Sequence, residues 1–361
     1  MSPPAPNAGL ASGTALALAA GLLWGLVFIA PLLLPDYPAL LLSAARYLAF
    51  GLIALPLAWW DRAALAQLSR ADWLEALKLS LVGNLLYYAF LAAAIQRAGG
   101  PLPTVIIGTL PVVIALATNW RDRRRAAARI AAAAGPVSAS PGTACDTASG
   151  TATGAAQSAA ADASPSLDAP LAWRRLAPSL LLLGAGIALV NHTELARLRT
   201  SADADLARYA WGGLLAVGAV ICWTWYPIRN ADWLRAHPGR PARVWATAQG
   251  LATLPLAALA YALFWGWSAL AAPDWPMPLG PAPERYVALM FAIGLLGSWL
   301  GTLCWNAASQ RLPTTLAGQL IVFETLAALS YAWVLRGHGP DAPALAGVAL
   351  LVAGVVWALR R

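Results

Sequence analysis

Charged side chains are scarce along this chain. Only 11% of its 361 residues are Asp, Glu, Lys or Arg, whereas 60% are hydrophobic and the mean hydropathy is +0.62. An ordinary soluble domain carries about a quarter charged residues. Since a water-soluble core cannot hide this much apolar surface, the composition excludes a soluble globular protein and predicts an integral membrane protein.

Motifs of metal, disulfide and catalytic sites are missing as well. The three Cys residues show no CxxC or similar spacing, and the three His residues have no second ligand at i+3 or i+4. We therefore predict no metal site, no disulfide and no cofactor. The chain also lacks GxSxG, HExxH, GxxxxGK and GxGxxG patterns in a suitable context, so an enzyme is disfavoured.

Lysine is nearly absent, and arginine carries the positive charge. The net charge of +8 rests on 23 Arg and one Lys. These residues lie between apolar runs and not on one face of a folded domain, so nucleic acid is not expected as a partner. With the amino terminus inside, seventeen basic residues fall in cytoplasmic segments, six fall on the opposite side, and Arg46 lies within a span. This positive-inside bias predicts that both termini are cytoplasmic.

Apolar runs that can cross a bilayer, which needs about 20 helical residues, recur ten times. The first run has no basic residue before it, so it is expected to remain as a helix and not to be a signal peptide. The predicted spans are residues 14–34, 39–60, 74–95, 102–119, 173–192, 208–228, 244–265, 286–306, 314–335 and 343–359. The predicted fold class is an all-α polytopic membrane protein in contact with membrane lipid.

Internal repetition organises these spans into two sets of five. Residues 49–58 (AFGLIALPLA) and 248–257 (AQGLATLPLA) are identical at seven of ten positions, with an offset of 199. Residues 81–97 and 295–311 are identical at seven of seventeen positions, with an offset of 214. Because five is odd, the second set must enter the membrane from the opposite face, an arrangement typical of secondary transporters.

The repeat predicts the domain boundaries. Residues 1–120 hold the first four helices of repeat 1, residues 173–192 its fifth helix, and residues 208–361 repeat 2. Residues 121–172 are predicted to be a cytoplasmic linker, first basic and then, over 126–170, rich in Ala, Ser and Gly with no apolar periodicity. Such a composition buries too little surface to offset chain entropy, so we expect this linker to be disordered.

Two ionisable residues lie inside predicted spans. Glu324 is near the middle of its span, where a charge costs about 2.5–3.5 kcal/mol on insertion scales. It either binds a proton or the cationic part of a substrate, or it makes a structural contact to a neighbouring helix. Arg46 lies seven residues into its span, where it either anchors the helix at the interface or lines an anion-accepting cavity.

The chain resembles the EamA-like branch of the drug/metabolite transporter superfamily. The resemblance rests on Trp24-Gly25, Arg46, the AIQRAGG stretch followed by Pro111, and GTLCWNAASQRLPTTLAGQLIVFETLAALSYAWVL in the second copy. It covers both halves and fails only over residues 126–170. The family fold that it implies has ten helices in two inverted EamA repeats, placed in a bacterial inner membrane.

The resemblance also implies a central cavity lined by helices one, three, four, six, eight and nine. Its candidate substrate-binding residues are Trp24, Tyr87, Thr109, Trp223, Trp305, Asn306 and Glu324. The implied activity is export of a small-molecule substrate, an amino acid, a related metabolite or a drug, either with protons as the coupling ion or by facilitated efflux. The alternative is a membrane receptor or scaffold that acts through the cytoplasmic linker; no oligomeric state is implied.

Overall fold

The described part of the chain is entirely helical. The computed structural model describes residues 6–98, 103, 106–133, 173–190, 192, 206–337 and 339–359, and these contain no strand. The main helices are α1 (Pro6–Gly25), α2 (Ala30–Leu33), α3 (Ala39–Leu65), α4 (Arg70–Leu79), α5 (Tyr87–Ala98), α7 (Leu110–Ala133), α9 (Trp173–Val190), α11 (Leu206–Ala236), α12 (Ala242–Ala271), α13 (Pro283–Ile293), α14 (Gly301–Ser309), α15 (Thr314–Leu320), α16 (Val322–Arg336) and α17 (Ala342–Leu359).

Seven helices of the described chain are long and apolar enough to cross a membrane. They are Gly9–Leu33, Ala39–Leu65, Arg70–Ala98, Ala207–Ala236, Ala242–Ala271, Pro283–Ser309 and Thr314–Leu335. Two shorter apolar helices cover Leu176–Leu189 and Ala342–Trp357. An α-helix satisfies its own backbone hydrogen bonds, which is what the bilayer interior requires. The chain is thus a polytopic membrane protein.

One predicted span and the start of the predicted linker differ from the structure. Span 102–119 was expected to be one helix, but α7 begins only at Leu110, with Pro111 in its first turn, where proline costs no hydrogen bond. The helix then continues through residues 121–133, which were assigned to the linker. This segment is rich in Ala and Arg, both strong helix formers. Residues 134–172 lie outside the described part.

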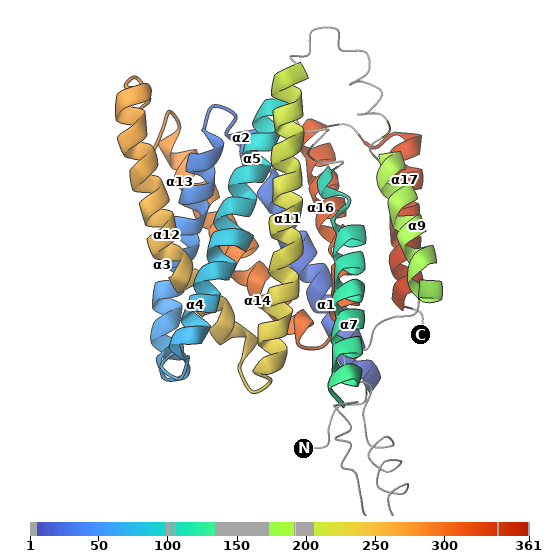
Figure 1. Ribbon diagram of the computed structural model, residues 1–361. Helices are drawn as coiled ribbons and strands as arrows, with labels where there is room; N and C mark the ends of the chain where they lie inside the picture. The colour runs from blue at the N-terminus through green and yellow to red at the C-terminus, as the bar shows by residue number, and fades with distance from the viewer. Residues whose placement is uncertain are drawn as a thin grey trace, which may run out of the picture.

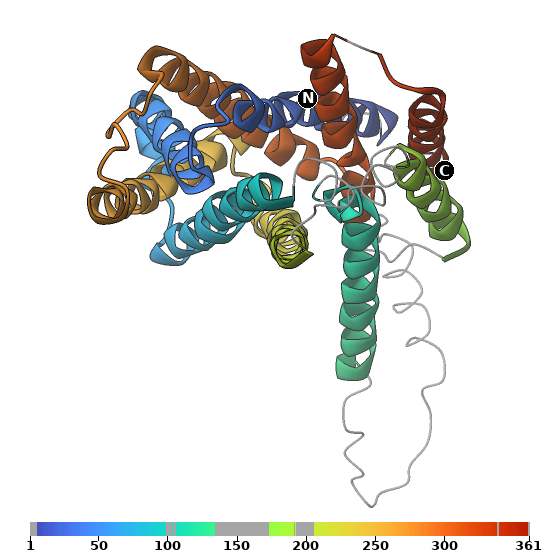
Figure 2. The ribbon, with the colours of Figure 1, turned by 90° about the horizontal axis from the view of Figure 1, so that it is seen from above.

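Two pairs of helices pack closely through glycines. A Cβ on Gly51 of α3 would lie 2.6 Å from Leu254 of α12, and a Cβ on Gly250 of α12 would lie 2.6 Å from Ala54 of α3. The pair α9 and α17 repeats this reciprocity, because Gly186 of α9 faces Leu351 and Gly354 of α17 faces Leu183. Small residues let membrane helices approach to backbone contact. Figure 2 shows α9 and α17 side by side at one end of the bundle, with α12 at the other end.

Two helices contain a π-helical stretch at related positions. The stretch η2 (Ser80–Leu86) joins α4 to α5, and η3 (Gly294–Leu300) joins α13 to α14. Their first residues are separated by 214 positions, the same offset that relates the two sequences. Gly83 of η2 lies against Tyr226, whereas Gly297 of η3 lies against Val27. π-Helical turns are rare and occur frequently at functional sites.

One face of the bundle, drawn at the bottom of Figure 1 and called the lower face here, carries a set of ion pairs between helices. The α3–α4 and α11–α12 connections and the start of α1 lie on this face (Figure 1). Its ion pairs are Asp61–Arg243 at 2.6 Å, Glu75–Arg229 at 2.6 Å, Arg121–Asp232 at 2.9 Å and Arg125–Asp232 at 2.9 Å. They connect α3 to α12, α4 to α11, and α7 to α11.

A buried amide network joins α11 and α12 to α14. The Asn230 Oδ1 accepts hydrogen bonds from Trp245 Nε1 at 2.9 Å and Gln249 Nε2 at 3.1 Å. The Asn230 Nδ2 donates to the Asn306 Oδ1 at 2.8 Å. Asn230, Gln249 and Asn306 are fully buried, and unpaired amides would be costly there. The network therefore holds α11, α12 and α14 together.

Candidate functional site

A small cavity lies in the interior of the bundle, between helices from the two halves of the chain. Residues from η1 (Leu26–Phe28), η2, η3 and from α1, α3, α5, α11, α14 and α16 line it. The lining residues are Trp24, Val27, Arg46, Tyr47, Asn84, Tyr87, Trp223, Gly297, Ser298, Thr302 and Glu324. Both π-helical stretches thus contribute side chains to the cavity wall.

Arg46 extends from α3 into this cavity and is only 5% exposed. Its Nε donates a hydrogen bond to the Ser298 Oγ at 3.0 Å. The guanidinium carbon lies 4.8 Å from the ring centroids of both Tyr47 and Tyr88, within the range of cation–π contacts. Its Nη1 has no hydrogen-bond partner in the structure. This burial contradicts the interface-anchor alternative for Arg46.

Glu324 reaches the cavity from the start of α16. The helical segment from Thr314 to Arg336 is interrupted at Ile321, so Glu324 lies in the first turn of a new helix. The positive end of the helix dipole favours a carboxylate at this position. Glu324 is 4% exposed, and its Oε2 has no hydrogen-bond partner in the structure.

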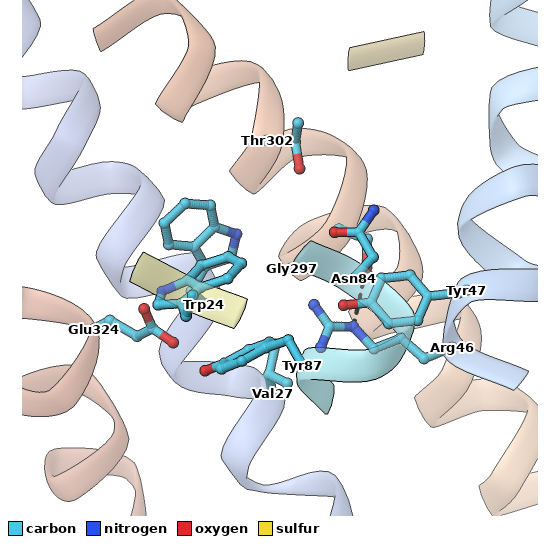
Figure 3. Close-up of a pocket in the computed structure, with 11 residues that line it drawn as sticks. Trp24, Val27, Arg46, Tyr47, Asn84, Tyr87, Gly297, Thr302 and Glu324 are labelled. Atoms are coloured by element: carbon cyan, nitrogen blue, oxygen red, sulfur yellow. Dashed lines mark hydrogen bonds between the residues drawn. The ribbon is translucent and has the colours of Figure 1, made fainter. Parts of the chain in front are cut away.

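Aromatic rings separate the two charged side chains. Tyr87 stacks on Trp223 with ring centroids 4.5 Å apart, and Trp24 meets Trp223 edge-on at 5.1 Å. In Figure 3, the Glu324 carboxylate and the Arg46 guanidinium lie on opposite sides of Trp24 and Tyr87. No salt bridge within 4.0 Å joins Arg46 to an acidic residue in the described chain. The cavity therefore has a cationic end, an anionic end and an apolar wall.

Metal-ligating side chains do not gather here. Within the ranges that the structure describes, no group of three or more His, Cys, Asp or Glu residues is placed to hold a metal ion. The groups that face the cavity can hydrogen-bond, pair with ions and stack on rings. The enclosed space is about 10 Å³, room for one water molecule, so a larger molecule enters only when the lining helices move apart.

Comparison with known proteins fits this arrangement. Residues 11–125 match the EamA-like transporter family. The inner membrane protein YtfF of Escherichia coli (strain K12) is 46% identical over 349 residues, which cover 97% of this chain and 95% of that protein. The chain belongs to the EamA-like transporter family.

Membership in the EamA-like family identifies the chain as a transporter of the drug/metabolite type, which points away from an enzyme. The relative is an inner membrane protein by its name. A protein of known crystal structure shares the fold with a TM-score of 0.62 over 96% of each chain. At 17% sequence identity, that likeness shows the fold alone.

Four of the seven predicted site residues meet at the cavity: Trp24, Tyr87, Trp223 and Glu324. The other three are placed elsewhere. Trp305 lies behind Trp24, with ring centroids 5.2 Å apart, and Asn306 belongs to the buried amide network. The Thr109 hydroxyl, just before α7, donates to its neighbour Ile106 O at 2.7 Å. None of the described residues of the predicted fourth span (102–119) lines the cavity, whereas α3 contributes Arg46 and Tyr47.

Several lining residues were not among the predicted site residues. Asn84 and Ser298 are the clearest case, because they are separated by the repeat offset of 214 and both face the cavity. A polar residue at the same position of both copies was the signal that could have identified them. Thr302 matches Tyr88 under the same offset and so carried this signal as well, whereas Tyr47 did not. Their inward orientation depends on how the helices rotate within the bundle.

Proposed function

We propose that this protein is a secondary transporter that exports small organic metabolites, amino acids or related compounds, or drugs, by alternating access. The observation that carries the proposal is the central cavity, in which Arg46 and Glu324 are buried without ionic partners. Ionisable residues inside a membrane are costly and mark substrate or ion pathways. A purely structural role would leave both charges neutralised by neighbouring side chains.

Reciprocal packing supports two inverted five-helix halves as the basis of alternating access. Gly51 and Gly250 are equivalent under the offset of 199, and each packs against the other helix; Leu254, which faces Gly51, corresponds to Leu55, next to the Ala54 that faces Gly250. The π-helical stretches and the Asn84–Ser298 pair exchange under the offset of 214. Two equivalent halves around a midplane site can open to either side by exchanging conformations.

Two sets of contacts lie on either side of Arg46 along α3. Toward the lower face, Asp61 pairs with Arg243. Toward the opposite face, Tyr37 stacks on Tyr286 with ring centroids 4.7 Å apart and donates a hydrogen bond to Leu279 O at 2.9 Å. In the proposed cycle these two sets break alternately. The lower face, rich in arginine, is the cytoplasmic one in this proposal, with both termini on it.

A growth-inhibition screen tests the function. Bacterial cells that overproduce the wild-type protein are challenged with amino acids, their analogues and toxic compounds, beside cells with the Glu324→Gln variant. Glu284→Gln, at an exposed position outside the cavity, is the matched control. We expect selective resistance with wild type and control and its loss in Glu324→Gln. Equal growth and equal intracellular accumulation of every compound in all strains would refute an exporter.

A further inference from the structure

Arg46 and Glu324 are complementary, yet they do not neutralise one another. Their charged groups lie at opposite sides of the cavity, with Trp24 and Tyr87 between them (Figure 3). Both side chains are more than nine-tenths buried, and each keeps a polar atom without a partner, Nη1 of Arg46 and Oε2 of Glu324. An unpaired charge is strongly unfavourable in such surroundings, so Arg46 requires an anionic partner, and Glu324 requires a cationic partner or a proton.

The guanidinium is fixed in place by its surroundings. Ser298 accepts the hydrogen bond from Nε, and the Tyr47 and Tyr88 rings flank the guanidinium carbon at 4.8 Å each. The Tyr88 hydroxyl is itself held by a hydrogen bond to Val27 O at 3.2 Å. A guanidinium held in this way presents its remaining N–H groups in a fixed direction, and its planar fork matches a carboxylate.

We infer that the cargo is a zwitterion, a small molecule with one carboxylate and one ammonium group. The carboxylate binds Arg46, the ammonium group binds Glu324, and the apolar remainder packs against Trp24, Tyr87 and Trp223. The inference rests on the proposed transport function and narrows its substrate class.

Other cargo classes fit the two ends less well. A monoanion bound at Arg46 leaves Glu324 without a counter-charge unless Glu324 also takes up a proton. A monocation bound at Glu324 leaves Arg46 without a counter-charge, and a neutral molecule supplies a counter-charge to neither side chain. A molecule that carries both charges, at separate positions, neutralises both ends by itself.

The test measures the thermal unfolding midpoint of the detergent-solubilised full chain with matched ligands. The first series is leucine, its amide, which lacks the carboxylate, and N-acetylleucine, which lacks the ammonium group. The second series is leucylleucine with the same two blocked forms, in which the charges are farther apart. We expect one zwitterion to bind more tightly than its blocked forms, by on the order of tenfold for each lost charge contact.

Charge-removing variants assign each contact. In Arg46→Gln, the zwitterion should no longer bind more tightly than the amide but should still bind more tightly than the N-acetyl form. In Glu324→Gln, the zwitterion should still bind more tightly than the amide but no longer more tightly than the N-acetyl form. Arg62→Gln and Glu284→Gln, at exposed positions outside the cavity, should behave as wild type. The thermal unfolding midpoint of each variant without ligand shows whether that variant folds. If a cavity variant does not fold, the comparison of zwitterions with their blocked forms on the wild-type protein still decides the inference.

The outcomes separate this inference from the proposed function. If blocked forms bind as well as their zwitterions, or if no zwitterion shifts the wild-type midpoint, the inference is overturned. A carrier of uncharged compounds would still give selective resistance in the growth screen. If no compound gives resistance, the proposed function fails independently of the binding result.

Discussion

Gly83 occupies the point where η2 meets α11. A Cβ added there would lie 2.1 Å from the Tyr226 ring, and Tyr226 is only 1% exposed. The corresponding contact in the second half, Gly297 against Val27, is 3.0 Å. The missing side chain therefore sets how closely these helices approach, at a position beside the cavity residue Asn84.

Replacing Gly83 with alanine should destabilise the protein. The added methyl group must displace a buried ring, and overpacking of this kind costs about 1–3 kcal/mol. The thermal unfolding midpoint of the purified protein should fall accordingly. Gly184→Ala is the matched control, because a Cβ there meets nothing within 4 Å. A Gly83→Ala variant as stable as Gly184→Ala would mean that the η2–α11 contact is looser than the structure shows.

Among the helices that the structure describes, α3 and α12 form one of the two most extensively packed pairs. Its glycines bring the two backbones together near their middle, and the Asp61–Arg243 ion pair joins their lower ends at 2.6 Å. The two partners differ in exposure: the Asp61 side chain is 4% exposed, whereas that of Arg243 is 57% exposed. The pair should therefore respond differently to the loss of each partner.

Removing Arg243 should cost more stability than removing Asp61. Without Arg243, a buried carboxylate is left without its cation; without Asp61, the arginine can be hydrated. The Arg243→Ala loss should lie between the about 1 kcal/mol of an exposed pair and the about 3–5 kcal/mol of a fully buried one. Denaturation midpoints of Arg243→Ala, Asp61→Ala and the double variant measure this. Equal losses in the two single variants would contradict the assigned burial.

At the scale of the molecule, described helices from both halves enclose a polar cavity in an apolar bundle. The helical fold could be predicted from composition and apolar runs, because a bilayer imposes one element type and one length. The position of Glu324 could be predicted for the same reason. The broken helix at Ile321 and the late start of α7 at Leu110 could not, since they depend on contacts between helices.

The site was predictable only in part. Trp24 and Trp223 were expected at the site on resemblance to the family, and both line the cavity. Asn306 was expected there on resemblance to the family, yet it pairs with Asn230 in the buried amide network. Whether Arg46 anchored the helix at the interface or lined the cavity depended on the rotation of α3, which is set by its packing on α12 and η3 and not by the sequence of α3 itself.

Accessibility of the cavity from both sides of the membrane tests the central claim most directly. Thr302 lines the cavity, and Thr302→Cys in a chain without Cys145, Cys222 and Cys304 gives one reactive thiol. A membrane-impermeant thiol reagent is applied to right-side-out and to inside-out vesicles. A carrier with a central alternating site predicts labelling from both sides, with a ratio that changes when a transported compound is added. Labelling from one side only, or from neither, would contradict it.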